Sequence, residues 1–293
     1  MPPQVAIVIL NWNNGTVTVD CLRSLEKLSY SNFFTLVLDN GSTDDSLEIL
    51  HRAYPGISVV QNDKNLGFAG GNNPGIRLAL EQGADYVLLL NNDTEVAPDF
   101  LDELIKVAEA DPKIGIASAK IYYYSEPDRL WFAGGKVNYW KGWTQHLGDL
   151  EKDVGQYDHT TDTDFVSGCA MLIRREVIEK IGVLYEPFFL YYEDSDYCSR
   201  ARRAGYRIVM APKAKVWHKV SSTTGKIKDL QLFYGQRNML AFERRNASPV
   251  RLAFFLPYYF GKFVAYNSLR ALLSGNSGRA KLIWKAALEG LFI

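Results

Sequence analysis

The chain has 293 residues, of which 47% are hydrophobic and 23% are charged, and its positive and negative side chains balance to a formal net charge of zero. A chain of this length and composition is long enough for one large α/β domain with a smaller appendage, and disorder is excluded. The balanced charge gives no reason to expect a nucleic-acid partner. Any anion site must therefore be local.

The cysteines and the N-terminal sequence indicate the compartment of the cell in which we expect the protein. The three cysteines, Cys21, Cys169 and Cys198, are far apart and odd in number, which fits neither a disulfide framework nor a zinc site. The N-terminus lacks a basic leader, and no apolar stretch approaches the roughly 20 residues that span a bilayer. We therefore expect a cytoplasmic protein without a transmembrane segment.

Apolar runs alternate with helical patterns through the first 120 residues. The expected strands are Val5–Leu10, Phe34–Asp39, Ser58–Gln61 and Tyr86–Asn91. The expected helices are Val17–Lys27, Asp44–Ala53, Asn72–Glu81 and Pro98–Asp111. Pro98 suits the first position of a helix. This alternation predicts an α/β fold with a mostly parallel, doubly wound sheet, in which ligands bind at the carboxyl ends of the strands.

After Ile114 the pattern changes to aromatic and glycine-rich stretches such as RLWFAGGKVNYWKGW, whose turns indicate hairpins. A strand is expected at Phe165–Ile173, helices at Arg175–Ile181 and Tyr197–Ala204, and a loop around the acidic run Glu193–Asp196. From Ile227 onward the chain reads as helical, with Pro257 breaking or kinking it. The expected division is one domain over 1–224, made of halves 1–113 and 114–224, and a helical segment over 225–293.

Polar clusters follow each of the four early strands, and this predicts one cleft rich in amides and carboxylates. In the first of the informative clusters, Asp39 ends a strand and precedes Gly41, so its carboxylate can take a base N–H or a ribose hydroxyl. The same residue types make an ordinary capped turn, and taken alone that interpretation is favoured.

The glycine-rich stretch NLGFAGGNN, residues 65–73, is expected to be a loop that enters a helix. Its glycines would let backbone N–H groups approach a nucleotide phosphate. The spacing matches neither the dinucleotide fingerprint nor the P-loop. A loop that needs small residues for packing is an equally supported alternative.

A carboxylate at the end of the very apolar strand Tyr86–Asn91 points to a metal. Asp93 can bind Mg²⁺ or Mn²⁺ together with the phosphates of a nucleotide diphosphate, because hard ions prefer oxygen ligands. One carboxylate is not a metal site, and a helix cap is the alternative. His218 is a candidate partner, although a lone histidine is more often a packed or surface residue.

The acidic run Glu193-Asp194-Ser195-Asp196 lies beside Tyr191 and Tyr192. A carboxylate in a partly apolar setting suits a general base that removes a proton from a hydroxyl. A solvated acidic turn before a helix is the alternative, and the neighbouring aromatic residues disfavour it.

Taken in order, these motifs resemble the inverting family 2 glycosyltransferases, especially their rhamnosyltransferase-like branch. The resemblance covers residues 5–224 and is carried by VAIVILNWN, LVLDNGSTDDS, NLGFAGGNN, LLLNNDT, FVSGCAMLIRREV, FFLYYEDSDYCSRARRAGY and WHKVSST. It implies a GT-A fold and transfer of a sugar, rhamnose being one candidate, from a nucleotide diphosphate donor that is TDP- or UDP-linked. A hydroxyl of a glycan or lipid-linked acceptor would receive the sugar, with a divalent metal, Mg²⁺ or Mn²⁺, at the diphosphate.

The resemblance also assigns residues by position. Those that would line the nucleotide cleft are Asn11, Asn13, Asp39, Asn65, Gly67, Asn72 and Asn92. Asp93 and His218 match the metal positions, Asp194 matches the catalytic base, and Glu193 beside it would orient the base or bind the acceptor. Many members carry a further carboxylate where this chain has Asn91, which implies a modest metal affinity.

Two arginines and the C-terminal segment leave alternatives open. Arg200 and Arg237 would either meet the diphosphate or pair with the acidic run. The segment 250–293 combines aromatic, aliphatic and basic residues, which fits a peripheral contact at the inner face of the cell membrane, with a packed appendage or a homodimer contact as the alternative.

Two other functions compete with the transferase. A sugar nucleotidyltransferase also has a nucleotide-binding α/β domain, but its glycine-rich, basic loop is missing after the first strand, where Asn11, Trp12 and Asn13 stand instead. A non-catalytic nucleotide-sugar-binding protein is disfavoured because Asp93, Asp194 and His218 are all present.

Overall fold

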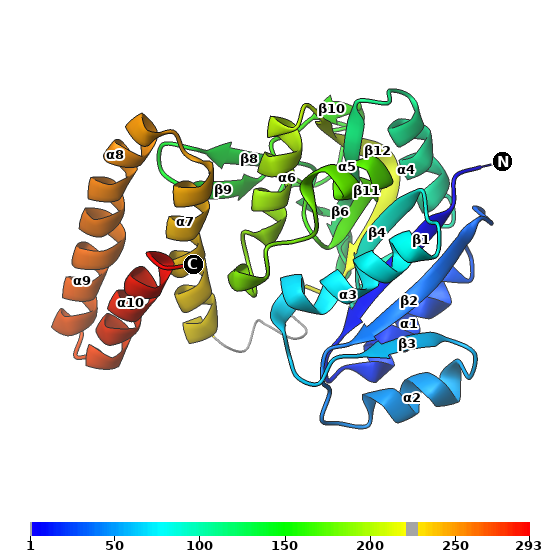
Figure 1. Ribbon diagram of the computed structural model, residues 1–293, viewed down its shortest axis with the longest axis horizontal. Helices are drawn as coiled ribbons and strands as arrows, with labels where there is room; N and C mark the ends of the chain where they lie inside the picture. Colours follow the sequence, from blue (N-terminus) through cyan, green and yellow to red (C-terminus); the bar gives the residue numbers. More distant parts are fainter. Residues whose placement is uncertain (1, 221–227) are drawn as a thin grey trace.

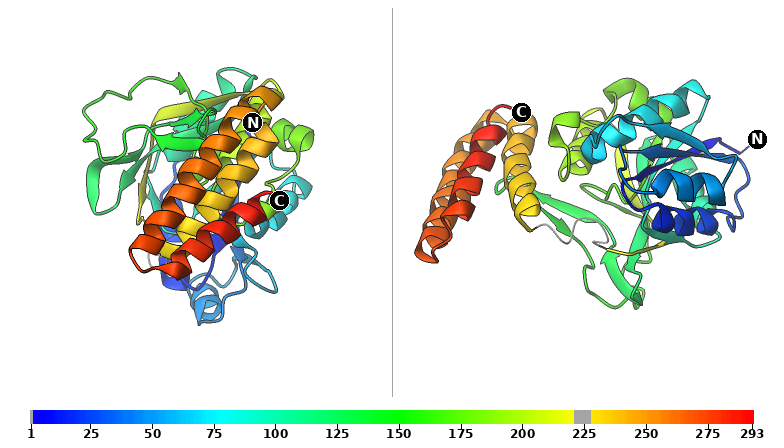
Figure 2. Two further views of the ribbon diagram at one scale, coloured as in Figure 1. Left: turned by 90° about the vertical axis from the view of Figure 1, so that its left-hand side faces the viewer. Right: turned by 90° about the horizontal axis from the view of Figure 1, so that it is seen from below.

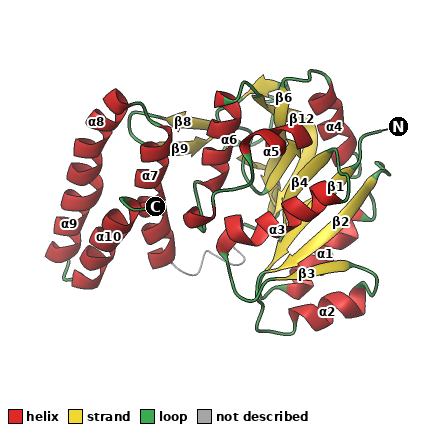
Figure 3. Cartoon of the chain, in the orientation of Figure 1, coloured by secondary structure: helices red, strands yellow, loops and turns green. Residues whose placement is uncertain are grey.

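The computed structural model describes residues 2–220 and 228–293. It consists of a central sheet covered by helices on both faces and a group of helices at one end of the molecule (Figure 1). Figure 3 shows the strands stacked side by side between the helical layers. The observed fold is therefore the α/β arrangement that the sequence predicts.

The parallel part of the sheet comprises the first four strands and the helices that connect them. The strand order is β3 (Ser58–Gln61), β2 (Phe33–Asp39), β1 (Val5–Asn11) and β4 (Tyr86–Asn91). The connecting helices are α1 (Gly15–Leu25), α2 (Ser46–Ala53) and α3 (Gly67–Glu81). The four expected strands are confirmed to within one residue. Their apolar runs are long because helices cover both faces of a parallel sheet.

All four helices of this half start at residues other than those predicted, α1 two positions earlier and α2 two positions later. Helix α3 begins at Gly67 and not at Asn72, so the glycine-rich stretch is the first part of the helix. The helix lies so close to the sheet that a Cβ on Gly75 would approach Leu38 Cδ2 to 2.5 Å, and small residues are required there. Helix α4 (Phe100–Glu109) starts after Pro98, whose carbonyl accepts a hydrogen bond from Ser29 N.

The remaining strands form the mixed part of the sheet. β11 (Ala170–Arg174) runs antiparallel between β4 and β6 (Ile114–Tyr123), and β12 (Arg207–His218) lies parallel to β6. The edge strands are β5 (Thr94–Val96), β7 (Glu126–Phe132) and β10 (Thr161–Asp162). The expected hairpins are confirmed by β6 with β7 and by a separate pair, β8 (Gly135–Asn138) and β9 (Trp143–His146).

Two further predictions for this half were wrong. The strand expected from Phe165 begins only at Ala170, because Phe165 makes a single bridge to Gly135 and Gly168 N donates to the Asp194 side chain instead of to a neighbouring strand. The acidic run is not a loop but the first turn of α6 (Glu193–Arg203), where negative charge is favourable next to the helix N-terminus. Helix α5 (Arg175–Ile181) and a 3₁₀ turn at Glu186–Phe188 precede it.

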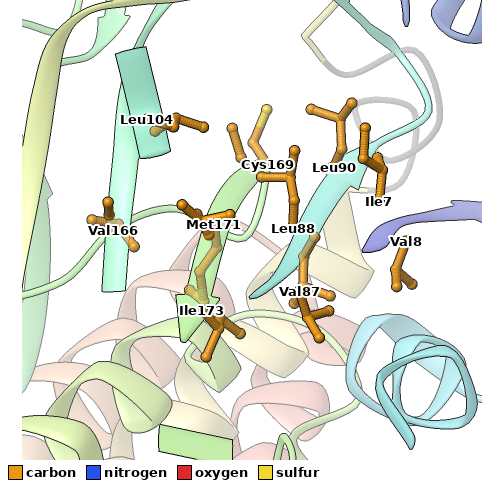
Figure 4. Close-up of a cluster of buried hydrophobic side chains, with 14 of the residues drawn as sticks. Ile7, Val8, Val87, Leu88, Leu90, Leu104, Val166, Cys169, Met171 and Ile173 are labelled. Atoms are coloured by element: carbon orange, nitrogen blue, oxygen red, sulfur yellow. The ribbon is translucent and has the colours of Figure 1, made fainter. Parts of the chain in front are cut away.

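The core of the domain lies between the sheet and its helices. Side chains of β1, β4 and β11 pack on both faces of the sheet, with Val8 and Met171 on one face and Leu88 on the other. Leu104 of α4 and Val166 belong to the same buried cluster (Figure 4). These strands therefore form a rigid platform, and their ends carry the candidate site residues.

The C-terminal helices pack side by side, away from β1, β2 and β3 (Figure 2). They are α7 (Lys228–Asn246), α8 (Pro249–Tyr258), a π-helical stretch (Tyr259–Tyr266), α9 (Asn267–Leu273) and α10 (Ser277–Gly290). Pro257 does not break the helix, which continues through the π-helical stretch. The expected helix start at Ile227 and domain boundary at 224 lie outside the described residues. No helix in the described part of the chain is long and apolar enough to cross a membrane.

Candidate active site

A hydrogen-bond network joins the polar residues that follow β1 and β2. Asn11 Nδ2 donates to Asp39 Oδ1 at 2.9 Å, and Ser42 N donates to Asp39 Oδ2 at 3.0 Å. Asn13 completes the network: its N donates to Ser42 Oγ, and its Oδ1 accepts from Thr43 N. Asn11 and Asp39 are almost fully buried, which holds the carboxylate in one orientation. Three predicted cleft residues therefore lie together at the carboxyl ends of these strands.

A second cluster centres on Asn40, which the sequence did not single out. Its Nδ2 donates to Asn65 Oδ1 at 3.0 Å and to the Gly67 carbonyl, while its Oδ1 accepts from Leu66 N. Asn65 Oδ1 also accepts from Gly67 N at 2.8 Å, which satisfies an N–H group at the start of α3. Asn65 and Gly67 are thus brought next to the Asp39 cluster, through a residue adjacent to Asp39 in sequence.

The other two predicted cleft residues are placed differently. Asn92 Nδ2 donates to Thr18 Oγ1, and Thr18 Oγ1 donates to Asn11 Oδ1, so Asn92 belongs to the same network as Asp39. Asn72 is buried inside α3, and its Nδ2 donates to the Phe68 carbonyl. The hydrogen bond from Asn72 therefore serves the helix itself and does not reach the other predicted residues.

Asp93 and His218 form the expected pair. Asp93 Oδ1 lies 3.0 Å from His218 Nε2, and both side chains are nearly buried. The pair forms because β5 and β12 run antiparallel with Thr94 opposite His218, so a residue of the first half meets the end of a strand of the second half. Lys219 N also donates to the Asp93 carbonyl.

His218 sits in an unusual environment. Burial lowers its pKa, but Cys169 and Asp93 together raise that pKa to about 10. Its Nδ1 is buried and has no hydrogen-bond partner among the described residues. In that part of the chain no group of three or more His, Cys, Asp or Glu side chains is placed to hold a metal ion. The protein therefore offers two ligands, one carboxylate oxygen and one imidazole nitrogen, a combination that a divalent transition metal such as Mn²⁺ accepts.

Asp194 is held at the start of α6 by backbone groups. Gly168 N donates to its Oδ2 at 3.2 Å, and Ser195 N donates to its Oδ1 at 2.6 Å. Burial raises the pKa of Asp194 above its usual range. Glu193 is more deeply buried, with a pKa raised well above the ordinary value by burial and by Asp194. Burial therefore disfavours the charged form of both acids, and backbone hydrogen bonds offset this for Asp194.

A pocket of about 340 Å³ opens in front of these acids. It is lined by Thr144, His146, Phe165, Tyr191, Tyr192, Glu193, Asp194, Ser195, Gln231 and Gly235. Its residues come from β9, the loop before β11, α6 and α7, so the pocket exists only when the second half is folded. Its mixture of aromatic rings and carboxyl groups is suited to a sugar, which has both apolar faces and hydroxyls.

Trp131 connects this pocket with the Asp93–His218 pair. Its ring lies 4.7 Å from the ring of His146 and 4.8 Å from the ring of His218, in edge-to-face contacts. Near Asp194 the backbone makes a second link, because Gly168 binds Asp194 and the adjacent Cys169 carbonyl accepts a hydrogen bond from Asn91 N. The base candidate and the metal candidates therefore belong to one continuous site.

The loop before α6 is strained and is held by α7. Phe189, Tyr191 and Tyr192 have φ angles of 64°, 69° and 70°, which side-chain-bearing residues rarely adopt. Asn238 Nδ2 lies 2.7–2.8 Å from the carbonyls of residues 188, 190 and 191. Arg237 also donates to the carbonyl of residue 188. Helix α7 thus fixes the loop that positions Asp194.

The two arginines are accounted for by this packing. Arg200 pairs with Asp196 at 2.9 Å, and Asp196 also binds Arg245 of α7, so this acid fastens α7 to α6. Arg237 neither pairs with the acidic run nor faces the nucleotide cluster, since its guanidinium binds loop carbonyls. One of the two alternatives for Arg200 is therefore confirmed, and neither holds for Arg237.

Sequence reasoning missed Asn40, Trp131, His146 and Asn238. Asn40 sits inside the motif LVLDNGS and was passed over for its neighbour Asp39. Trp131 lies in the aromatic stretch that predicted hairpins, His146 and Asn238 lie in no motif, and only tertiary contacts bring the three to the site.

The comparisons with known proteins identify the family. The model of the family described as "Glycosyl transferase family 2" matches residues 6–182, more than half of the chain. The chain belongs to glycosyl transferase family 2. As a family 2 glycosyltransferase it is an enzyme, and neither a sugar nucleotidyltransferase nor a mere binding protein.

Curated relatives place the chain near rhamnosyltransferases. It is 25% identical to the N-acetylglucosaminyl-diphospho-decaprenol L-rhamnosyltransferase of Mycobacterium tuberculosis, over 77% of this chain and 79% of that protein. It is 23% identical to the dTDP-rhamnosyl transferase RfbF of Shigella flexneri, over 86% and 84%. The uncharacterized protein y4gI of Sinorhizobium fredii is 28% identical over 76% of this chain, which spans only 25% of that protein.

A solved structure supports the fold. The family 2 glycosyltransferase resembles the mannosyltransferase PcManGT from Pyrobaculum calidifontis, solved in complex with GDP-Man and Mn²⁺, with a TM-score of 0.61 at 16% sequence identity, over 100% of this chain and 88% of that one. At this identity the likeness shows the fold alone, and that fold is GT-A.

Proposed function

We propose that this glycosyltransferase moves a sugar from a nucleotide diphosphate donor to an acceptor hydroxyl with inversion, and that Asp194 is the general base. The observation that carries the proposal is the continuity of the site. Asp194 and the Asp93–His218 pair come from different parts of the chain. Gly168 N binds Asp194, and Trp131 contacts both His218 and His146, which lines the pocket in front of Asp194.

In the proposed reaction, the acceptor hydroxyl lies in the pocket in front of Asp194. The Asp194 carboxylate takes the proton of that hydroxyl. At the same time the hydroxyl oxygen attacks the anomeric carbon from the face opposite the nucleotide diphosphate, which leaves. Burial brings the pKa of Asp194 closer to the operating pH, which favours such a base. Glu193, which is adjacent, would bind the acceptor or help to orient Asp194.

The donor side is proposed to use the polar network at the strand ends. Asp39, fixed by Asn11 and Ser42, would accept hydrogen bonds from the base or the ribose. Asn13, Asn65, Gly67, Asn72 and Asn92 complete the proposed nucleotide contacts. Asp93 and His218 would hold a divalent cation, Mg²⁺ or Mn²⁺, whose charge offsets that of the departing diphosphate. His218 has Nε2 directed at Asp93 and no partner for Nδ1 among the described residues, which supports its proposed role as a metal ligand.

The donor and acceptor classes are proposed from the relatives. One relative is a dTDP-rhamnosyl transferase, and another acts on a diphospho-decaprenol. By this likeness we propose a TDP- or UDP-linked donor, with rhamnose as the first sugar to test, and a glycan or lipid-linked acceptor in polysaccharide biosynthesis. The enzyme would then work at the inner face of the cell membrane, with residues 250–293 in peripheral contact with it or, alternatively, forming a homodimer.

The test compares transfer with donor binding in Asp194→Asn. The asparagine keeps the side-chain shape but cannot take the proton, so turnover should fall by roughly a thousandfold or more. Donor affinity, measured by thermal shift with TDP- and UDP-sugars, should stay within about twofold. Asp45→Asn, an exposed substitution at the start of α2, is the matched control and should keep full activity. If Asp194→Asn retains most of the wild-type turnover, Asp194 is not the base.

A further inference from the structure

The C-terminal segment differs in charge from the rest of the chain. Residues 249–293 carry six basic side chains and only one acidic one, Glu289, although the whole chain has no net charge. The basic residues are Arg251, Lys262, Arg270, Arg279, Lys281 and Lys285. The remainder of the protein therefore has a matching excess of negative charge, and the molecule has one basic end.

The same segment also holds most of the exposed apolar side chains. Nine of the thirteen large hydrophobic residues that are exposed in the described part of the chain lie in it. They are Val250, Phe254, Tyr266, Leu269, Leu272, Leu273, Trp284, Leu288 and Phe292. A soluble surface scatters such residues singly, whereas a concentration of them marks a surface that binds something.

Helix α10 arranges these residues in a regular pattern. Lys281, Trp284, Lys285 and Leu288 are spaced i, i+3, i+4 and i+7, which places them on one side of the helix. All four are exposed, and Phe292, 86% exposed, follows just beyond the helix. The opposite side, with Ile283 and Ala287, packs into the small core of the C-terminal helices, so the exposed residues are not needed to hold the fold together.

The preceding helix repeats the pattern. Tyr266, Leu269, Arg270 and Leu273 have the same i, i+3, i+4 and i+7 spacing and are exposed, Leu273 to 80%. Lys262 and Arg270 both lie over the ring of Tyr266, at 4.6 Å and 5.8 Å from its centroid. Basic and apolar groups therefore share one surface and are not segregated to opposite faces. Helices α9 and α10 pack against each other (Figure 2).

We infer that two stripes dock on a bilayer surface that carries anionic lipids. One runs from Tyr266, the last residue of the π-helical stretch, to Leu273 of α9, and the other from Lys281 to Leu288 on α10. Leucine, tyrosine and tryptophan side chains would enter the boundary between headgroups and acyl chains, and the lysines and arginines between them would meet the lipid phosphates. This deepens the membrane contact suggested above and rests on the proposed function only for its purpose, the delivery of the site to a lipid-linked acceptor.

The charge pattern favours a membrane over a second copy of the chain. In a symmetric dimer through this surface, each basic stripe would meet the same residues of its partner. Like charges would then face one another, with only Glu289 to offset them. An anionic bilayer offers the opposite charge over the whole surface as well as an apolar layer below it.

The experiment is flotation of the intact chain with vesicles of phosphatidylcholine alone or with added phosphatidylglycerol. The wild type should float with the anionic vesicles and release as salt is raised. Arg270→Glu, Lys281→Glu and Lys285→Glu combined should weaken binding roughly a hundredfold. Leu273→Ser with Leu288→Ser should weaken it at least tenfold, since both leucines would leave the bilayer.

Matched controls carry the same changes on the catalytic domain. Lys27→Glu, Lys113→Glu and Lys213→Glu combined alter the net charge equally and should float like the wild type. Circular dichroism and donor-induced thermal shift should be unchanged in every variant, which separates vesicle binding from the chemistry of Asp194. Absence of wild-type flotation with anionic vesicles overturns the inference. So does an equal loss in the control, or a dimer in sedimentation that the stripe variants abolish.

Discussion

Residues 1–113 and the rest of the chain differ in how their buried polar groups are hydrogen-bonded. At the ends of β1 and β2, the amides and carboxylates of Asn11, Asp39 and Asn40 hydrogen-bond to one another and to backbone groups. The buried side-chain atoms that lack a hydrogen-bond partner among the described residues all lie between positions 193 and 268. They belong to Glu193, Tyr197, His218, Gln236, Glu243 and Ser268.

The contrast indicates that the two parts of the site have different roles. A fully hydrogen-bonded cluster is rigid, and it suits a nucleotide that must always bind in one orientation. Unpartnered buried groups have perturbed proton affinity and are typical of places where protons move or ligands complete the site. The predictions below test whether this division holds, beginning with the largest effect.

The first prediction concerns the pair that joins the two halves, Asp93 and His218. Either Asp93→Asn or His218→Ala should lower turnover in Mn²⁺ roughly a thousandfold, since both would remove a ligand of the same cation. The double variant should lose little more than each single one, because the two residues act as a unit. Steady-state kinetics with and without EDTA measures this. Additive losses would mean that the two residues act separately.

The second prediction concerns the contact between α3 and the strained loop. A Cβ on Gly67, whose φ is +73°, would lie 2.3 Å from the Phe189 carbonyl oxygen. Gly67→Ala should destabilise the protein by roughly 3 kcal/mol, from backbone strain and the clash together. Gly275, at the end of α9, has a similar φ of +75° but open space around it, so Gly275→Ala should cost only about 1 kcal/mol. Equal losses in urea unfolding would show that no clash occurs at the loop.

The third prediction uses Glu243 of α7, which is fully buried with neither oxygen paired among the described residues. Burial raises the pKa of Glu243 from 4.5 to about 7. The folded state therefore binds more protons than the unfolded state across that window, so stability is greatest below it and falls as the pH rises through it.

Between about pH 5 and pH 8, the wild type should lose roughly 2 kcal/mol more of its free energy of unfolding than Glu243→Gln loses. Urea unfolding at about pH 5 and pH 8 measures the difference between wild type and variant. Glu81→Gln, an exposed substitution at the end of α3, should leave the pH dependence as it is. The same slope in wild type and Glu243→Gln would mean that Glu243 is charged in the folded protein.

The smallest effect is expected at Asn238, which holds the loop carbonyls. Asn238→Ala should leave those carbonyls unpaired, destabilise the protein by roughly 1.5 kcal/mol and lower kcat about tenfold, because Asp194 is positioned less firmly. The KM for the donor should not change, since the donor cluster is separate. Asn32→Ala, which removes one hydrogen bond to Pro2, controls for the loss of an amide. A raised donor KM with an unchanged kcat would contradict the separation of the two halves.

The sequence predicted the positions of polar residues in the first half of the chain better than those in the rest. Around Asp39 and Asp93, each functional residue follows a buried parallel strand, so local pattern and strand order were enough to place it. The acidic run was recognised, but its place in the first turn of α6 was not. The residues before the helix, Tyr191 and Tyr192, adopt left-handed φ angles, which an aromatic residue type does not predict.

Other parts of the site have no local signature at all. Trp131 and His146 sit on different strands and meet only through the packing of β7 and the hairpin of β8 and β9. Asn238 reaches residues 47–50 positions earlier in the chain. Pairings over such distances depend on the tertiary fold, and no spacing within a motif encodes them.

The position of Trp131 between His146 and His218 has a consequence for how such enzymes diverge. One indole contacts both His146 in the wall of the proposed acceptor pocket and His218 of the proposed metal pair. Under the proposed function, a substitution of Trp131 that reshapes the pocket would also disturb His218, so a change of acceptor would have to arise from residues that do not touch that ring. Acceptor range and metal requirement would in this sense be inherited together.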